Sequence, residues 1–367
     1  MTKQGSRHLW AGVVLAAIAF APVSSAQAQE KLIFASYLTE VYSASRTDNW
    51  FLNEIEKRSG GEIKFERYWA GALLKAPDLY PALSSGAADV VESAPSSYNV
   101  REYPLSNILL PLTSNRGDAV AKAWARLYAN NADFRKEYEG KGAKVLYAQA
   151  WAENTLWSRK AVAKADDLKG LKVRAIPPVS EALAKLGATP VALTWPDGIE
   201  GLQRGVVDGM SSSPFDSGVH GNVMDVAKFG TDAGGLGIFA IAVTSIGLDR
   251  YKKMSEKHRK IVDDVAAEAQ VKGIEFLNQS VDDAVDKMCT KKDGLTIHLF
   301  PPEEVEKVKQ VAVAHLQDAW IKRAETEAKV KGRPMLDEFL SYVREYEKTS
   351  TYLSGFERFM KKCGKKS

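Results

Sequence analysis

The stretch from residue 166 to residue 214 limits the possible folds of this chain more than any other. Residues 171–176 form a short apolar run that predicts a strand, and Pro177-Pro178 must end it because proline has no amide hydrogen for a sheet. The predicted elements after the prolines are a helix, a strand, a helix and a strand, over residues 179–186, 189–193, 197–204 and 206–210. Strands that alternate with helices indicate a parallel α/β domain. Arg174 is then expected near the carboxyl end of a strand, where open α/β sheets bind ligands.

Alternating strands and helices also occupy the rest of the chain. Before residue 166, the apolar patterns predict strands at 31–37, 62–68, 88–91 and 144–150 and helices at 45–58, 77–85 and 118–138. After residue 214, they predict a strand at 236–246, a long helix at 252–288, a strand at 296–300, and helices at 302–328 and 335–346. A mature chain of about 340 residues exceeds what one core usually serves. We therefore expect two α/β domains joined by crossing segments, with the long helix lying across both.

The first 28 residues have the pattern of a secretory signal peptide. The start is basic, residues 9–21 are apolar, and Ala26-Gln27-Ala28 fits the small-residue cleavage site. The apolar run is too short to span a bilayer, so we expect its removal and no membrane insertion. The mature protein is predicted to be exported, in a bacterium to the periplasm.

Composition and spacing exclude several classes of function. The formal net charge of +4 over 367 residues argues against a nucleic-acid-binding protein, because such proteins concentrate basic residues on one face. The histidines and cysteines show no metal-ligand spacing, and no nucleotide-binding loop or nucleophile motif appears, so we expect neither a metal nor a cofactor. Cys289 and Cys363 can pair in an oxidising compartment or remain two free thiols, and the sequence leaves both open.

Three motifs, in order, resemble one known family. They are Asp-Leu-Lys-Gly-Leu-Lys-Val-Arg at 167–174, Leu-Gly-Ala-Thr-Pro-Val at 186–191 and Leu-Gln-Arg-Gly-Val-Val-Asp-Gly at 202–209, with weaker matches at 59–63 and 70–73. The chain resembles the DctP-like extracytoplasmic solute-binding proteins of TRAP transporters over most of its mature length, up to about residue 250. The resemblance implies a two-lobed periplasmic-binding-protein fold, capture of an organic acid between the lobes, and a TRAP permease as membrane partner. It implies no enzymatic activity, and we expect a monomer.

The predicted lobes are discontinuous. Lobe I covers residues 29–152 with part of 236–275, lobe II covers 153–235 with part of 276–350, and residues 351–367 form a C-terminal tail. Two alternatives stay open. One is a secreted enzyme acting on a small carboxylic acid in the same cleft, and the other is the binding protein of an ABC transporter. The enzyme would change its ligand, whereas a binding protein would release it unchanged.

Arg174 is the first candidate for ligand binding. Its planar guanidinium matches a carboxylate bidentately, although spacing alone fits an ordinary surface salt bridge equally well. In the family that the chain resembles, the arginine at this position clamps the carboxylate of the substrate. Many members carry a second arginine on the strand that enters the second lobe, where this chain has Asn154, and Arg159 is the reserve candidate nearby. Ser212 stands where the family places a polar, ligand-facing side chain, but it also fits a polar turn.

Aromatic residues near predicted strand ends are candidates for the walls of the site. They are Tyr37, Trp69, Tyr98, Trp151, Trp157, Trp195 and Phe215, although tryptophans more often lie in a core. Glu92 and Ser93 follow a short strand and offer a polar contact. We predict a ligand with one carboxylate and an apolar or aromatic remainder, in preference to succinate, malate or fumarate. A second carboxylate buried without a partner cation would be costly.

Overall fold

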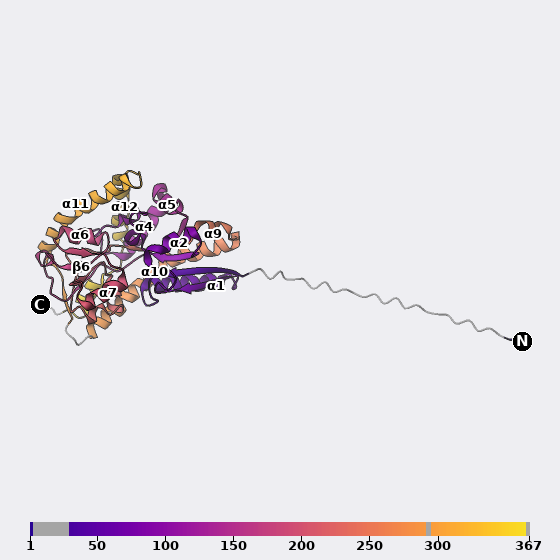
Figure 1. Ribbon diagram of the computed structural model, residues 1–367, viewed down its shortest axis with the longest axis horizontal. Coiled ribbons are helices and arrows are strands. Elements are labelled where there is room, and N and C mark those ends of the chain that lie inside the picture. Colours follow the sequence, from indigo (N-terminus) through magenta and orange to yellow (C-terminus); the bar gives the residue numbers. More distant parts are fainter. Residues whose placement is uncertain (3–28, 291–294, 365–367) are drawn as a thin grey trace.

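The computed structural model describes residues 1–2, 29–290 and 295–364, and those from residue 29 onwards form two α/β lobes (Figure 1). The predicted signal peptide lies almost wholly outside the described residues. Each lobe is built on one mixed sheet. Within the described residues, no helix is long and apolar enough to cross a membrane.

The first sheet has the strand order β2-β1-β3-β10-β4. Its strands are β1 (Glu30–Ser36), β2 (Ile63–Tyr68), β3 (Val90–Ser93), β4 (Ala143–Ala150) and β10 (Ile241–Gly247). Its main helices are α1 (Ser43–Arg58), α2 (Leu79–Ser85), α4 (Gly117–Asn130) and α5 (Ala132–Glu139), and the short helix α3 (Pro95–Tyr98) follows β3. The first three strands are parallel, but β10 is antiparallel to both β3 and β4. The expected parallel sheet is therefore mixed, because β4 leaves this lobe and β10 brings the chain back in the opposite direction.

The second sheet has the order β11-β9-β5-β8-β6-β7. Its strands are β5 (Leu156–Ser158), β6 (Lys172–Arg174), β7 (Thr189–Val191), β8 (Gly209–Met210), β9 (Phe229–Thr231) and β11 (Thr296–His298). The helices α6 (Val179–Lys185), α7 (Trp195–Arg204) and α8 (Phe215–His220) accompany it. The unit β6-α6-β7-α7-β8 follows the predicted order, and β6 is parallel to both β7 and β8. Arg174 is the last residue of β6.

A long helix, α10 (Glu256–Thr290), joins the two lobes. Its 35 residues span about 50 Å, and it contacts α1 and β4 of the first lobe and α8 of the second (Figure 1). The short helix α9 (Leu248–Lys253) precedes it, and α11 (Pro302–Thr326) and α12 (Gly332–Glu347) follow. Helix α11 packs on α6, whereas α12 packs on α4, so the chain crosses between the lobes again. The predicted two-lobed fold with a spanning helix is confirmed.

The C-terminal residues are ordered against the rest of the molecule. Residues Gly355–Lys362 form helix α13, which packs on α10 and α8, although the sequence analysis predicted only a tail here. A disulfide joins Cys289 at the end of α10 to Cys363 just after α13. At the other end of α13, the buried carboxylate of Glu153 accepts a hydrogen bond from the backbone nitrogen of Gly355 at 2.6 Å. The segment between the lobes is thereby tied to the C-terminal helix.

Candidate ligand-binding site

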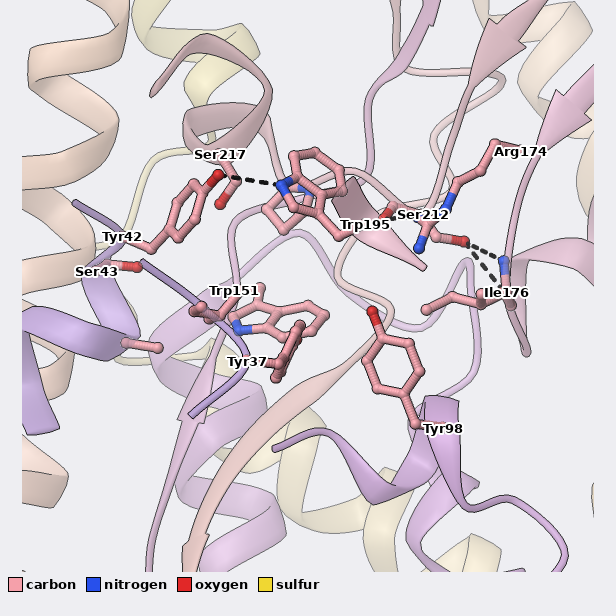
Figure 2. Close-up of a pocket in the computed structure, with 13 residues that line it drawn as sticks. Tyr37, Tyr42, Ser43, Tyr98, Trp151, Arg174, Ile176, Trp195, Ser212 and Ser217 are labelled. Carbon is pink, nitrogen blue, oxygen red and sulfur yellow. Dashed lines mark hydrogen bonds between the residues drawn. The ribbon is translucent and has the colours of Figure 1, made fainter. Parts of the chain in front are cut away.

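A cavity lies between the two lobes, with about 400 Å³ of space free of protein atoms, which includes space open to solvent (Figure 2). The first lobe supplies the loop from β1 to α1, helix α3 and the segment after β4. The second supplies the end of β6, the start of α7 and the segment from β8 to α8. The lining residues are Tyr37, Leu38, Tyr42, Ser43, Ala44, Tyr98, Trp151, Arg174, Ile176, Trp195, Ser212, Pro214 and Ser217.

Arg174 lies in this cavity and is fully buried. Its Nε donates to the carbonyl oxygen of Leu193 at 3.0 Å, and its Nη1 donates to those of Ser211 at 3.1 Å and Ser212 at 3.0 Å. Its Nη2 has no hydrogen-bond partner among the described residues. These bonds fix the guanidinium at the end of β6 with one nitrogen unused.

The positive charge of Arg174 has no protein counter-ion within residues 29–290 and 295–364, since no aspartate or glutamate there forms an ion pair with it. Burial lowers the pKa of Arg174, and the phenols of Tyr98 and Tyr37 act in the opposite direction. An arginine side chain nevertheless stays charged in a protein. A buried cation without an anion is unfavourable, so the cavity is electrostatically suited to a negatively charged ligand.

Gly198 on α7 makes room for the arginine. A Cβ atom at this position would lie 2.9 Å from Cγ and 3.1 Å from Cδ of Arg174. The stem of the arginine therefore lies against the backbone of α7, and any side chain at Gly198 would push it towards the cavity or away from its backbone partners.

Aromatic rings form most of the remaining wall. Tyr37 and Tyr98 make an edge-to-face pair with ring centroids 5.2 Å apart, and the Trp195 ring centroid lies 5.7 Å from Cζ of Arg174. The indole nitrogen of Trp195 donates to the hydroxyl of Tyr42 at 3.0 Å, which links the two lobes directly (Figure 2). Trp151 lines the cavity as well. Such walls can bury an apolar or aromatic body next to the charged end of a ligand.

Ser212 lines the cavity, but its hydroxyl is not available in the way we predicted. Its Oγ donates to the carbonyl oxygen of Ile176 and accepts from the nitrogen of Ile176, both at 3.0 Å. A serine hydroxyl has one hydrogen, so none is left for a carboxylate. The residue adopts a left-handed backbone conformation with a φ of 48°, and its side chain fixes Ile176, just before Pro177-Pro178.

Asn154 and Arg159 do not line this cavity. Asn154 is buried, and its Oδ1 accepts from the hydroxyl of Ser211 at 3.0 Å, so it acts behind the segment that holds Arg174. Arg159 is exposed and donates to the carbonyl oxygen of Val207 at 3.3 Å. Among the described lining residues, Arg174 is the one cation.

Five other predicted site residues lie outside the cavity wall: Trp69, Glu92, Ser93, Trp157 and Phe215. Trp69 packs against Phe34, with ring centroids 4.8 Å apart, and Phe215 packs against Phe356. Trp157 is fully buried in the core of the second lobe. Glu92 and Ser93 are buried in the first sheet, where Glu92 accepts from the hydroxyl of Ser36 at 2.6 Å. These side chains pack against other parts of the protein, which proximity to a strand end does not reveal.

The cavity is also lined by residues that follow β1 and were not predicted, among them Tyr42, Ser43 and Ala44. The signal for them was available. They lie between a predicted parallel strand and the helix after it, which is the edge where α/β sheets bind ligands. Ile176, Pro214 and Ser217 follow strands of the second sheet and were missed in the same way.

A two-lobed α/β protein with a buried, uncompensated cation between its lobes has the architecture of a solute-binding protein. The family model "Bacterial extracellular solute-binding protein, family 7" (DctP) matches residues 35–323, and the chain belongs to this family. The ectoine-binding periplasmic protein TeaA of Halomonas elongata is 23% identical over 306 residues, which cover 82% of this chain and 86% of TeaA. The ectoine/5-hydroxyectoine-binding periplasmic protein UehA of Ruegeria pomeroyi is 25% identical over 313 residues, 84% of this chain and 90% of UehA.

Solved structures share the fold. A TRAP solute-binding protein of Rhodoferax ferrireducens, in complex with copurified benzoate, superposes with a TM-score of 0.76 at 23% identity, covering 87% of this chain and 99% of that one. A marine metagenome TRAP solute-binding protein specific for aromatic acid ligands gives a TM-score of 0.76 at 22% identity, with the same coverage. The resemblance to the solute-binding proteins of TRAP transporters is confirmed.

Proposed function

We propose that this protein captures a small organic acid between its lobes, with Arg174 pairing with the carboxylate. The observation that carries this proposal is the fully buried guanidinium that keeps one unused nitrogen and has no counter-ion among the described residues. A ligand carboxylate would supply the missing negative charge beside a fully buried guanidinium, where such a pairing is strong.

The ligand we propose carries one carboxylate and an apolar or aromatic body. Arg174 is the one cation among the described residues that line the cavity, so a second carboxylate would be buried without a partner. Tyr37, Trp151 and Trp195 can bury an apolar body at about 25 cal/mol per Å². The complexes of related proteins with benzoate, 3-hydroxybenzoate and mandelate support the same class of ligand.

We place this capture in the periplasm, after removal of residues 1–28, and expect delivery of the unchanged ligand to a TRAP permease. Curated relatives of the chain are periplasmic binding proteins. In this proposal, lobe I comprises residues 29–152 with part of 236–275, and lobe II comprises 153–235 with part of 276–350. The protein acts as a monomer that binds its ligand and catalyses no reaction.

A thermal-shift panel tests the ligand class. Benzoate, 3-hydroxybenzoate, mandelate and pyroglutamate are compared with succinate, malate and fumarate. We expect stabilisation by one or more of the monoacids, and we expect Arg174→Ala to abolish it, because loss of one partner of a buried charge pair costs about 3 to 5 kcal/mol. Stabilisation confined to the four-carbon diacids would refute the single-carboxylate proposal. Equal stabilisation of the wild type and Arg174→Ala would remove Arg174 from the site.

A further inference from the structure

The hydrogen bonds of Arg174 limit how a carboxylate can bind to it. A guanidinium has five N–H donors, and bidentate binding uses donors on two of its nitrogens. The donors on Nε and Nη1 are given to the carbonyl oxygens of Leu193, Ser211 and Ser212. Nη2 alone remains, so the bidentate fork that the sequence analysis assumed is not free. If one oxygen of a carboxylate binds Nη2, its second oxygen needs a hydrogen-bond donor from another residue.

Tyr98 is placed to be that donor. It ends helix α3 in the first lobe and lines the cavity, and in Figure 2 its hydroxyl points towards the end of the Arg174 side chain. Burial raises the pKa of Tyr98. The second-largest influence on this pKa is the charge of Arg174, which lowers it. The phenol is thus close to the guanidinium and remains protonated at neutral pH, which lets it donate a hydrogen bond.

The other hydroxyl groups of the cavity are less suitable. The hydrogen of Ser212 is given to Ile176. The hydroxyl of Tyr42 accepts from Trp195 and keeps its hydrogen, but it lies across Trp195 from Arg174 (Figure 2). Ser43 and Ser217 lie beside Tyr42, on the side away from Arg174 (Figure 2). The remaining candidate is Tyr37. Burial and the neighbouring Tyr98 and Glu92 all influence the pKa of Tyr37 more strongly than the charge of Arg174 does.

We propose that the ligand's carboxylate is held between Nη2 of Arg174 and the hydroxyl of Tyr98, which makes Tyr98 a specificity-determining residue for the acid group. This inference rests on the proposed capture of an organic acid. Because Tyr98 belongs to the first lobe and Arg174 to the second, the carboxylate bonds to both lobes at once. A donor to the carboxylate contributes equally to every acid that binds, whatever its body, whereas a wall residue contributes according to the shape of that body.

Tyr98→Phe tests the assignment by calorimetry with each acid of the panel that stabilises the wild type, namely benzoate, 3-hydroxybenzoate, mandelate or pyroglutamate. We expect the dissociation constant to rise about tenfold or more, by a similar factor for each acid, because a hydrogen bond to a charged group is lost. The melting temperature of the ligand-free variant should stay close to that of the wild type. Tyr128→Phe is the matched control, since it removes a phenol hydroxyl of the same lobe outside the cavity.

Three results would overturn the assignment of Tyr98. They are an unchanged affinity in Tyr98→Phe, a loss that follows the body of the acid, and a larger loss in Tyr37→Phe than in Tyr98→Phe. If no acid of the panel stabilises the wild type, the proposed function itself fails, and this outcome is distinct from the other three.

Discussion

The buried carboxyl group of Glu153 should make the stability of the protein depend measurably on pH. This residue lies between β4 and β5, where the chain passes from one lobe to the other, and it is almost fully buried. Burial and, to a smaller extent, the charge of Asp216 raise the pKa of Glu153 from 4.5 to about 7, although the hydrogen bonds from Gly355 and Phe356 act to lower it. The protonated form therefore stabilises the folded state fully below about pH 4.5, and this contribution is lost as the pH rises through about 7.

The magnitude follows from the two pKa values. When the pH rises from about 5 to about 8, ionisation of Glu153 lowers the free energy of unfolding by about 2.5 kcal/mol. Glu153→Gln removes this ionisation and can keep the contacts. The amide oxygen can accept from Gly355 in place of Oε1, and the amide nitrogen can donate to the hydroxyl of Tyr352, which contacts Oε2 at 3.3 Å.

Urea denaturation at about pH 5 and about pH 8, with the disulfide intact, measures the effect. The wild type should lose about 2.5 kcal/mol more of its unfolding free energy across this interval than Glu153→Gln does. Parallel losses in the two proteins would refute the reasoning. Glu357→Gln on α13 is a control of opposite sign: burial acts to raise the pKa of Glu357, but hydrogen bonds from Ser354 and the Arg116 ion pair lower it overall. Because a lowered pKa places this titration below 4.5, the destabilisation of Glu357→Gln should be nearly the same at about pH 5 and about pH 8 and should shrink only at lower pH.

Two further predictions concern the site and the C-terminus. Gly198→Ala should weaken acid binding about tenfold with little change in stability, because its Cβ would displace Arg174 while alanine favours the helix by about 1 kcal/mol. Gly201→Ala on the same helix, which does not contact Arg174, is the control, and equal affinities in the two variants would contradict the steric explanation. Reduction of the disulfide, which closes a loop with a sequence separation of 74, should remove about 4 to 5 kcal/mol and lower the melting temperature without changing which acid binds. A Cys289→Ser/Cys363→Ser variant should be indifferent to reductant, and an unaltered melting temperature of the reduced wild type would contradict the prediction.

Most elements could be predicted because their signals are local. The predicted helix at 252–288 is observed as Glu256–Thr290, and the strand that carries Arg174 ends before the two prolines as expected. The predicted helix at 118–138 is two helices, because Asn131 accepts a hydrogen bond from the nitrogen of Phe134 and begins a second one. Helix α13 was missed although its signal was present. Ser354 and Glu357 form a capping box, a recognisable start of a helix.

The walls of the site were harder to predict, because a side chain's direction depends on its register and on distant neighbours. Trp157 points into the core because Gly218 and Gly230 leave space there. A Cβ atom at Gly218 would lie 2.1 Å from Nε1 of Trp157, and one at Gly230 would lie 3.2 Å from its ring. Neither glycine is near Trp157 in sequence, so no local pattern distinguishes this tryptophan from Trp195, which does line the cavity. The position of Arg174 could be predicted because a strand end followed by two prolines is a local signal, whereas its ligand role was implied by the family resemblance.

The distribution of the site between the lobes explains how a ligand can drive closure. Arg174 and Trp195 belong to the second lobe, whereas Tyr37, Tyr42 and Tyr98 belong to the first. When the lobes separate, water can solvate the guanidinium, but in the closed form the charge is buried and has no counter-ion among the described residues. We expect a carboxylate to offset that cost when the lobes are as close as in this structure, where Trp195 bonds to Tyr42 across them. On the proposed function, we therefore expect the acid to bind a closed state more tightly than an open one, and this difference in affinity would be the free energy available to close the lobes.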